Sequence, residues 1–195
     1  MTDVSSEARE GAPWYWAQFE AGRAKAGQIP PGADIAVFTQ GLTKPAGTVP
    51  ALWRFHRTRL PDHLAARGVV TDDLVAEHMA LALFGAHQQS VGVLMHRPGV
   101  RLGAAARALH ERYSEDGVDR VMESAARAQT LPGVFLRVRA LVSMLAAARE
   151  PLDYTSLLHD LRAWPDPERR ARVIRGWGFT YRPWVTAGEP AGAKG

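Results

Sequence analysis

The chain has no cysteine, and only three of its 24 basic residues are lysine. The absence of thiols excludes disulfide bonds, cysteine nucleophiles and cysteine-rich zinc sites, and it fits a reducing cytosol. No run of 18 apolar residues occurs, and Met1–Gly11 is polar and acidic, without the apolar core of a signal peptide. We therefore expect a cytoplasmic protein that makes no contact with a membrane.

Signals for β-strands are also scarce, because alternating runs of Val, Ile and Thr and Asn-Gly turns are missing. We expect an all-α fold of two small packed helical bundles, with about eight helices and no sheet. Residues 13–96 form the N-terminal bundle, residues 97–184 form a basic C-terminal bundle, and residues 185–195 form a flexible tail. The predicted helices cover about residues 14–25, 34–42, 48–55, 71–89, 102–113, 118–129, 132–149, 153–164 and 166–178.

Local capping signals fix several of these helix starts. Thr48 and Thr71 are expected N-caps, Asp153 or Thr155 caps the next-to-last helix, and Asp166-Pro167 begins the last one. The helix from residue 131 shows how the core forms, because its apolar residues are spaced by three and four and make one stripe. That stripe consists of Leu131, Val134, Phe135, Val138, Leu141, Val142 and Leu145.

Recognisable catalytic and cofactor motifs are missing. The chain contains no phosphate-binding loop, dinucleotide fingerprint or nucleophile elbow. His78 and His87 are nine positions apart, so they point about 180° apart on one helix and cannot share a metal from it. Asp153 and Asp160 can share a helix face, but a cap and a surface pair is the favoured interpretation. We expect no catalytic residue, no metal and no cofactor, with His78 in the core.

Six tryptophans offer rings on which nucleobases could stack. Trp53, Trp164 and Trp177 lie on or beside apolar helix faces, which favours core packing for each of them. The positions of Trp14 and Trp16 stay open.

Charge is distributed unequally along the chain. Residues 1–96 carry eight basic and nine acidic side chains, whereas residues 97–195 carry 16 and 11, a net charge of +5. Arginine suits phosphate contact, because its guanidinium group can donate two parallel hydrogen bonds to one phosphate. A GC-rich genome would also favour arginine over lysine, without any binding role.

Helix positions predict which arginines reach solvent. Arg169, Arg172 and Arg175 are spaced by three, and Arg120 and Arg127 by seven, so each set lies on a polar face opposite an apolar one. These five arginines are the physical argument for a polyanionic partner. Five phosphate contacts on a single strand would give a slope of log K against log salt near about −3.5.

Neighbouring carboxylates supply the alternative. Glu123 can pair with Arg127, and Glu168 with Arg172, at i,i+4. Such exposed pairs contribute only about 0.3–0.5 kcal/mol, so they would not prevent phosphate binding.

Arg137 and Arg139 flank the apolar stripe of their helix on opposite sides. At most one of the two is therefore expected to be a strong phosphate contact.

Five segments in order carry a resemblance to a known family. They are Thr48-Val49-Pro50-Ala51-Leu52-Trp53-Arg54, Leu83-Phe84-Gly85-Ala86-His87-Gln88-Gln89-Ser90, Met95-His96-Arg97-Pro98-Gly99-Val100-Arg101-Leu102-Gly103, Leu152-Asp153-Tyr154 and Asp160-Leu161-Arg162-Ala163-Trp164. Together they resemble the CasB family, the small subunit of the type I-E CRISPR complex called Cascade. The resemblance covers about residues 13–184.

The resemblance implies an all-α antiviral-defence protein of two small bundles without enzymatic activity. Two copies of the family's subunit lie head to tail in the complex, beside the other Cascade subunits. They help to hold the guide RNA–target DNA duplex and the displaced DNA strand. Base pairing supplies the sequence specificity there, so the protein should bind backbone shape and charge.

The family's basic positions carry over unevenly. Arg54 follows the packing residues of the first motif, and Arg101, Arg107, Arg120 and Arg127 fall where the family has basic residues in its second bundle. Arg139 matches a family Arg pair less well, because Val138 separates it from Arg137. The nucleic-acid-binding residues predicted from helix position and resemblance together are Arg54, Arg101, Arg107, Arg120, Arg127, Arg139, Arg169, Arg172 and Arg175.

One departure from the family concerns the first bundle. Thr39-Gln40 and the residues before them stand where the family usually has an arginine pair, and Lys44 is the nearest substitute. Which strand each arginine contacts, and whether the chain binds nucleic acid alone, stay open.

Two other functions remain as alternatives. One is a structural brace that contacts only protein subunits, with its arginines paired to acidic partner surfaces. The other is a helix-turn-helix regulator, which would need sequence-selective duplex binding and a two-fold dimer.

Overall fold

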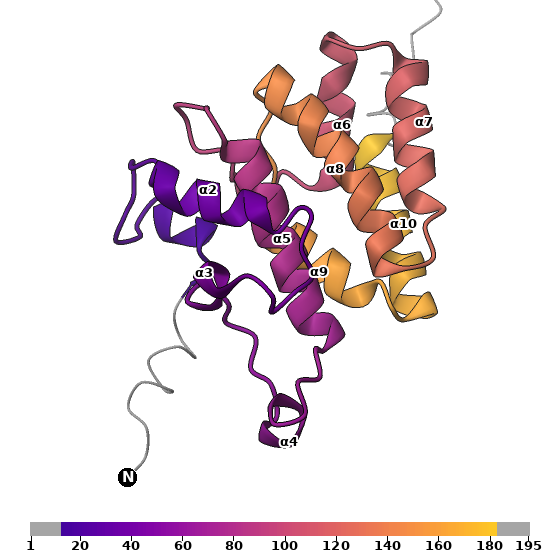
Figure 1. The fold of residues 1–195 in the computed structure, drawn as a ribbon. Coiled ribbons are helices and arrows are strands. Elements are labelled where there is room, and N and C mark those ends of the chain that lie inside the picture. The colour runs from indigo at the N-terminus through magenta and orange to yellow at the C-terminus, as the bar shows by residue number, and fades with distance from the viewer. Residues whose placement is uncertain (1–12, 183–195) are drawn as a thin grey trace, which may run out of the picture.

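The structure, a computed structural model, describes residues 13–182, so the predicted tail at 185–195 lies outside the described residues. Within that range the chain folds into nine α-helices and two 3-10 turns without a sheet, which confirms the all-α prediction (Figure 1). The helices are α2 (Gly32–Gln40), α3 (Pro50–Trp53), α4 (Asp62–Ala65), α5 (Asp72–Gln88), α6 (Leu102–Ala108), α7 (Glu115–Ala126), α8 (Leu131–Ala148), α9 (Tyr154–Ala163) and α10 (Pro167–Tyr181). The 3-10 turns cover Trp16–Phe19 and Leu109–Glu111.

Side-chain caps begin the longer helices. Thr71 accepts a hydrogen bond from the backbone N–H of Leu74 at the start of α5, and Asp153 and Asp166 accept the equivalent bonds at the starts of α9 and α10. These three caps were predicted. Thr48 does not cap α3, because its hydroxyl donates to the carbonyl of Pro45 and Val49 occupies the N-cap position. The caps of α7 and α8 are Ser114 and Thr130.

Helix α5 lies between the N-terminal helix α2 and the C-terminal helices α8 and α9. It packs against α2 on one side and against α8 and α9 on the other (Figure 1). The contact with α2 is close at Gly85, where a Cβ atom would lie 2.6 Å from the Cβ of Phe38. Buried side chains of both halves belong to one core cluster. The division into bundles at residue 96 stays a prediction.

The C-terminal helices position the arginine-rich surface. Helix α10 packs against α6, and α7 packs against α8. Gly103 of α6 lets α10 approach closely, because a Cβ atom there would lie 2.1 Å from the carbonyl oxygen of Trp177 and 2.3 Å from Oγ1 of Thr180. The two helices run in the same direction, since Arg101 lies near Gly176 and His110 contacts Tyr181.

Helix α8 shows the predicted apolar stripe. Its stripe residues are buried except Phe135, which is half-buried and packs against the core. By length and composition alone, α8 is long and apolar enough to cross a membrane, and it is the one such helix among the described residues. Arg137 and Arg139 lie within it, and its inward face belongs to the protein core.

The expected first helix over 14–25 is wrong. Only Trp16–Phe19 form a 3-10 turn, and the chain bends at Gly22, whose φ of 76° is in the left-handed region. Trp16 is fully buried, and its indole N–H donates to Thr155 at 2.9 Å. Tertiary burial of aromatic rings, rather than a helical repeat, therefore fixes this segment.

Candidate nucleic-acid interface

Eight of the nine predicted arginines are exposed, and Arg139 is half-buried. They lie on five elements: Arg54 after α3, Arg101 and Arg107 on α6, Arg120 and Arg127 on α7, Arg139 on α8, and Arg169, Arg172 and Arg175 on α10. Exposure alone does not make them one site, so their neighbours and ion pairs decide which of them can bind an anion.

Three of these arginines gather where α6 begins beside α10. Arg101 and Arg172 line one hollow of about 210 Å³, together with Asp160, Val173, Gly176 and Trp177. Arg172 also lines an adjoining hollow with Arg175 and Glu168. We call Arg101, Arg172 and Arg175 the arginine cluster. The sequence placed Arg101 some 70 positions from the other two, so only the packing of α6 on α10 brings them together.

The arginine cluster keeps its charge. Among the ion pairs within residues 13–182, none involves Arg101, Arg172 or Arg175. The predicted pair of Glu168 with Arg172 does not form there. Three guanidinium groups on neighbouring hollows are thus available to an anionic ligand.

Asp160 lines the hollow that Arg101 and Arg172 share. Its Oδ2 accepts a hydrogen bond from the indole N–H of Trp177 at 2.7 Å, so the expectation of a surface pair is wrong for this residue. Burial raises the pKa of Asp160 to about 6, as does the nearby Asp153 carboxylate, while the Trp177 hydrogen bond and the Arg101 charge lower it. The hollow therefore becomes more positive as the pH falls through about 6.

Two other predicted arginines are neutralised by neighbours. Arg54 pairs with Asp34 at 3.0 Å, and Arg127 pairs with Glu123 at 2.8 Å, the i,i+4 pair that the sequence predicted. Arg120 donates from Nε to the backbone carbonyl of Asp116 at 3.1 Å. These residues are exposed, but a phosphate would compete with a carboxylate at Arg54 and Arg127.

Of the pair on α8, Arg137 is the residue held in place. It donates to Oγ of Ser124 at 2.9 Å and to the carbonyl of Gly133 at 2.8 Å. No such bond holds the side chain of Arg139 among the described residues, which leaves Arg139 as the one available to a ligand.

Two arginines outside the predicted set have structural roles. Arg170 donates to the carbonyls of Gln129 and Trp164 and so ties α10 to the connection between α7 and α8. Arg162 lies over the ring of Trp14 at 4.9 Å and donates to Thr58. Their long-range partners carry no local sequence signal.

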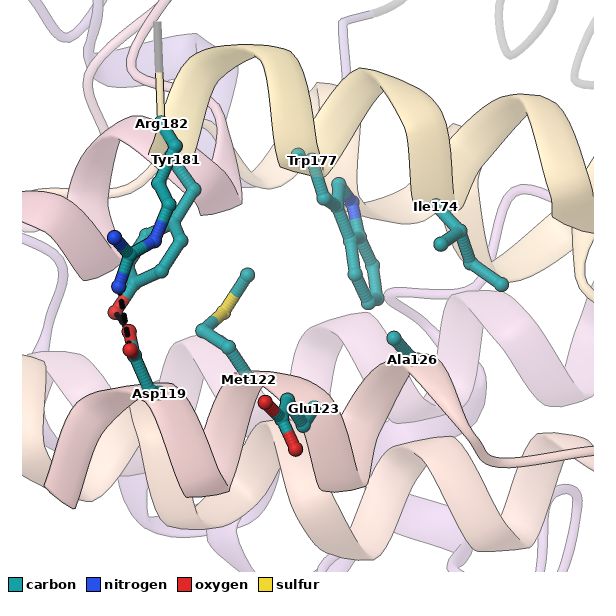
Figure 2. A pocket seen from close by; sticks show the side chains of 9 residues that line it. Asp119, Met122, Glu123, Ala126, Ile174, Trp177, Tyr181 and Arg182 are labelled. Atoms are coloured by element: carbon teal, nitrogen blue, oxygen red, sulfur yellow. Dashed lines mark hydrogen bonds and ion pairs between the residues drawn. The ribbon is translucent and has the colours of Figure 1, made fainter. Parts of the chain in front are cut away.

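A second hollow, of about 220 Å³, lies between α7 and α10 (Figure 2). Met122, Ala126, Ile174 and Trp177 give it an apolar lining, and Tyr181 and Arg182 both bond to Asp119 at one end. None of the nine predicted arginines lines it. With Asp119 and Glu123 on its wall, it is poorly suited to a polyanion.

Two buried histidines, His78 and His87, make hydrogen bonds inside the core. His78 is buried, as predicted, and its Nε2 lies 2.9 Å from the carbonyl of Lys44. His87 is buried against the hydroxyl of Tyr154 at 2.9 Å, and burial lowers its pKa to about 4. Between residues 13 and 182, no group of three His, Asp or Glu side chains is placed to hold a metal.

The loop between the halves is anchored through Asp153 and His96. Oδ2 of Asp153 accepts from the backbone N–H of Gly99 and from the hydroxyl of Ser156. His96 Nδ1 accepts from the backbone N–H of Tyr154, and its Nε2 donates to Glu20 at 2.8 Å. The Met95–Gly103 and Leu152–Tyr154 segments of the resemblance thus meet here, and Arg101 follows directly from this anchor.

Two of the three tryptophans expected in the core are there. Trp164 and Trp177 are buried and stack at 5.2 Å. Trp53 is 59% exposed, so the core prediction is wrong for it. Helix α3 has only four residues, and Leu52, not Trp53, faces inward.

Known proteins match this fold. A protein-family model described as CRISPR-associated protein Cse2 matches residues 34–181. The solved structure of CasB from Thermobifida fusca is 27% identical, with a TM-score of 0.61 over 77% of this chain and 84% of that one. CasB from Thermus thermophilus is 26% identical, with a TM-score of 0.56 over 80% and 88%.

A further solved structure, of a CRISPR-associated Cse2-family protein that is also from Thermus thermophilus, supports the fold alone. It is 22% identical, with a TM-score of 0.57 over 76% of this chain and 85% of that one. Among the curated proteins, none matches the chain.

Proposed function

The chain belongs to the CRISPR-associated Cse2 family, also called CasB, whose members are Cascade subunits, and from this we propose that it stabilises nucleic acid inside a type I-E surveillance complex. It acts without catalysis, in the cytoplasm, beside other Cascade subunits and a second copy of itself. Its ligands are the backbones of the guide RNA–target DNA duplex and the displaced strand.

The arginine cluster is the observation that carries this proposal. Arg101, Arg172 and Arg175 line adjoining hollows and have no carboxylate partner among the described residues. Guanidinium groups bind phosphate oxygens through paired, charge-assisted hydrogen bonds, and such phosphate contacts carry no base identity. A sugar-phosphate backbone is therefore the ligand that this surface suits. Arg107, Arg120, Arg139 and Arg169 would extend the contact, while Arg54 and Arg127 would first have to leave their carboxylates.

Charge reversal tests the proposal directly. The double variant Arg101→Glu, Arg172→Glu should bind a single-stranded oligonucleotide about tenfold more weakly or worse in a low-salt filter-binding assay, because two phosphate contacts become repulsions. The double variant Arg112→Glu, Arg149→Glu is the matched control, since both arginines are exposed, lie outside the predicted binding set and give the same change in net charge, so affinity should change little. Equal retention of the oligonucleotide by the double variant and the wild type would contradict the proposal.

A structural brace is the second candidate. Helix α8 leaves Leu136 64% exposed, with Pro132 and Ala140 on the same outer face. Exposed apolar surface of this kind is typical of protein contacts. A brace predicts that charge reversal in the arginine cluster leaves oligonucleotide retention unchanged, while Leu136→Glu weakens co-purification with the other subunits.

A further inference from the structure

The hollow between α7 and α10 opens to solvent and is lined mainly by apolar side chains (Figure 2). Met122, Ala126, Ile174 and Trp177 form its walls, and its volume is about 220 Å³. Sites for small molecules usually measure about 300–1,000 Å³, so this hollow suits one large side chain better than a small molecule. We call it the α7–α10 hollow.

The described part of the chain ends at the rim of the α7–α10 hollow. Its last two residues, Tyr181 and Arg182, line one end of the hollow, and both donate hydrogen bonds to Asp119 of α7 (Figure 2). These bonds hold the end of α10 against α7. Arg182 leaves the helix in an extended conformation, with φ −120° and ψ 103°, which suits a residue that precedes a proline. The residues that follow therefore start at the edge of an apolar surface.

The sequence after Arg182 suits that surface. Residues 183–185 are Pro-Trp-Val, and no charged side chain occurs before Glu189. Two residues span at most about 7 Å of chain, so Trp184 is tethered close to the rim. Burial of this segment removes no charge from water, whereas its indole ring gains apolar contact.

We propose that Trp184 docks in the α7–α10 hollow of its own chain and closes it. The carboxylates of Asp119 and Glu123 on the wall supply acceptors for the N–H group that a buried indole must satisfy. A short tether also gives Trp184 an effective concentration in the millimolar range, which favours it over a separate partner of similar affinity. The docked ring braces α10, which carries Arg172 and Arg175, against α7. This inference does not depend on nucleic-acid binding.

Fluorescence tests the proposal in the full-length chain. The difference in emission between the wild type and Trp184→Phe isolates the emission of Trp184. That emission should be blue-shifted from the emission of free tryptophan in water, and acrylamide should quench it several times less efficiently, because protein surrounds a docked ring. Both properties should survive dilution, since the hollow and the ring belong to one chain.

Two results would overturn the proposal at this stage. Emission and quenching like those of free tryptophan would show that Trp184 is in solvent. Shielding that is lost on dilution would place the ring in a second copy of the chain instead.

A variant that fills the α7–α10 hollow locates the docked ring. Ala126→Phe adds a ring on the wall of the hollow and should displace Trp184, so that its emission and quenching move toward those of free tryptophan. Ala147→Phe is the matched control, because Ala147 is exposed on α8 and does not line the hollow, and it should leave both properties unchanged. If Trp184 stays shielded in Ala126→Phe, it docks elsewhere and the proposal is wrong.

Thermal unfolding gives a second readout of the same contact. Trp184→Ala should lower the unfolding midpoint of the wild type by about 3–12 °C, because the walls of the hollow return to water. The same substitution should have much less effect in Ala126→Phe, whose hollow is already filled. Equal losses in both backgrounds, or no loss in the wild type, would contradict docking in this hollow. Either outcome leaves the proposal of nucleic-acid binding to its own test.

Discussion

Asp160 is the residue whose ionisation bears most directly on the arginine cluster. Burial raises its pKa to about 6, so the folded state favours the neutral acid. The stability that this group contributes is therefore full below its unfolded pKa of about 4 and is lost as the pH rises through about 6. Asparagine keeps an oxygen for the Trp177 hydrogen bond but carries no charge.

We predict that Asp160→Asn is more stabilising, relative to the wild type, at pH 7 than at pH 4. A pKa of about 6 in the folded protein, against about 4 in the unfolded chain, corresponds to about 3 kcal/mol as an upper bound on the difference. Urea unfolding of both proteins at the two pH values measures it. The low pKa of His87 makes both proteins more stable as the pH rises, which opposes the effect of Asp160. Because His87 is present in both proteins, its contribution cancels when their stabilities are compared. A stability difference that is independent of pH would contradict the assignment.

Single residues were predictable where their partners are local. The pair Glu123–Arg127 forms as its i,i+4 spacing indicated. The long-range pair Arg54–Asp34 and the meeting of Arg101 with Arg172 depend on how helices pack, which spacing along one helix does not encode. The exposure of Trp53 follows from α3 stopping after four residues, and the sequence predicted a longer helix there.

At the scale of elements, the close contact of α6 with α10 depends on Gly103. A methyl group there would collide with the backbone of Trp177, so Gly103→Ala should destabilise the protein by about 1–3 kcal/mol and separate Arg101 from Arg172. Gly178→Ala is the matched control, because nothing lies within 4 Å of a Cβ atom at that position of α10 and Gly178 lines neither hollow of the arginine cluster. It should stabilise the protein by up to about 1 kcal/mol through helix propensity.

Thermal unfolding of the two glycine variants, together with oligonucleotide binding by each, checks this prediction. Equal stability of Gly103→Ala and the wild type would show that α6 and α10 are not packed as described.

Asp153 joins the start of α9 to the loop that precedes α6. Its carboxylate accepts three hydrogen bonds, from the backbone N–H groups of Ser156 and Gly99 and from the Ser156 hydroxyl. Although burial raises its pKa, these bonds and His96 bring the pKa below its ordinary value. The stability contributed by Asp153 is therefore present at neutral pH and declines as the pH falls below about 4.

Asp153→Ala should cost about 2–4 kcal/mol at pH 7, because it removes a cap and leaves the other bonded groups without their acceptor. Ser114→Ala removes the single cap bond of α7 and should cost about 1 kcal/mol. Chemical denaturation of the two variants compares them directly. Similar losses for both would mean that Asp153 acts only as a helix cap.

Helices with a local start signal or an apolar stripe were predicted best, and one four-residue helix was missed. The caps at Thr71, Asp153 and Asp166 placed α5, α9 and α10, and the spacing of apolar residues placed α8. Helix α10 continues through Gly176 and Gly178 to Tyr181, beyond the predicted end at residue 178, because its packing on α6 outweighs glycine's low propensity. Helix α4 was missed, since its four residues, none of them buried, leave no apolar pattern.

At the scale of the whole molecule, α5 links the two predicted bundles through its contacts with α2, α8 and α9. We therefore expect both halves to unfold in one transition, with equal calorimetric and van't Hoff enthalpies. Differential scanning calorimetry checks this expectation. Two resolved transitions would indicate that the halves on either side of residue 96 are independently stable.

The most direct test of the account is the salt dependence of binding to a single-stranded oligonucleotide. Each phosphate contact on a single strand contributes about −0.7 to the slope of log K against log salt. Replacing Arg101, Arg172 and Arg175 by alanine should therefore make the slope of the full-length chain less negative by about 2. An unchanged slope in this triple variant, with its helices intact by circular dichroism, would mean that these arginines do not bind the backbone.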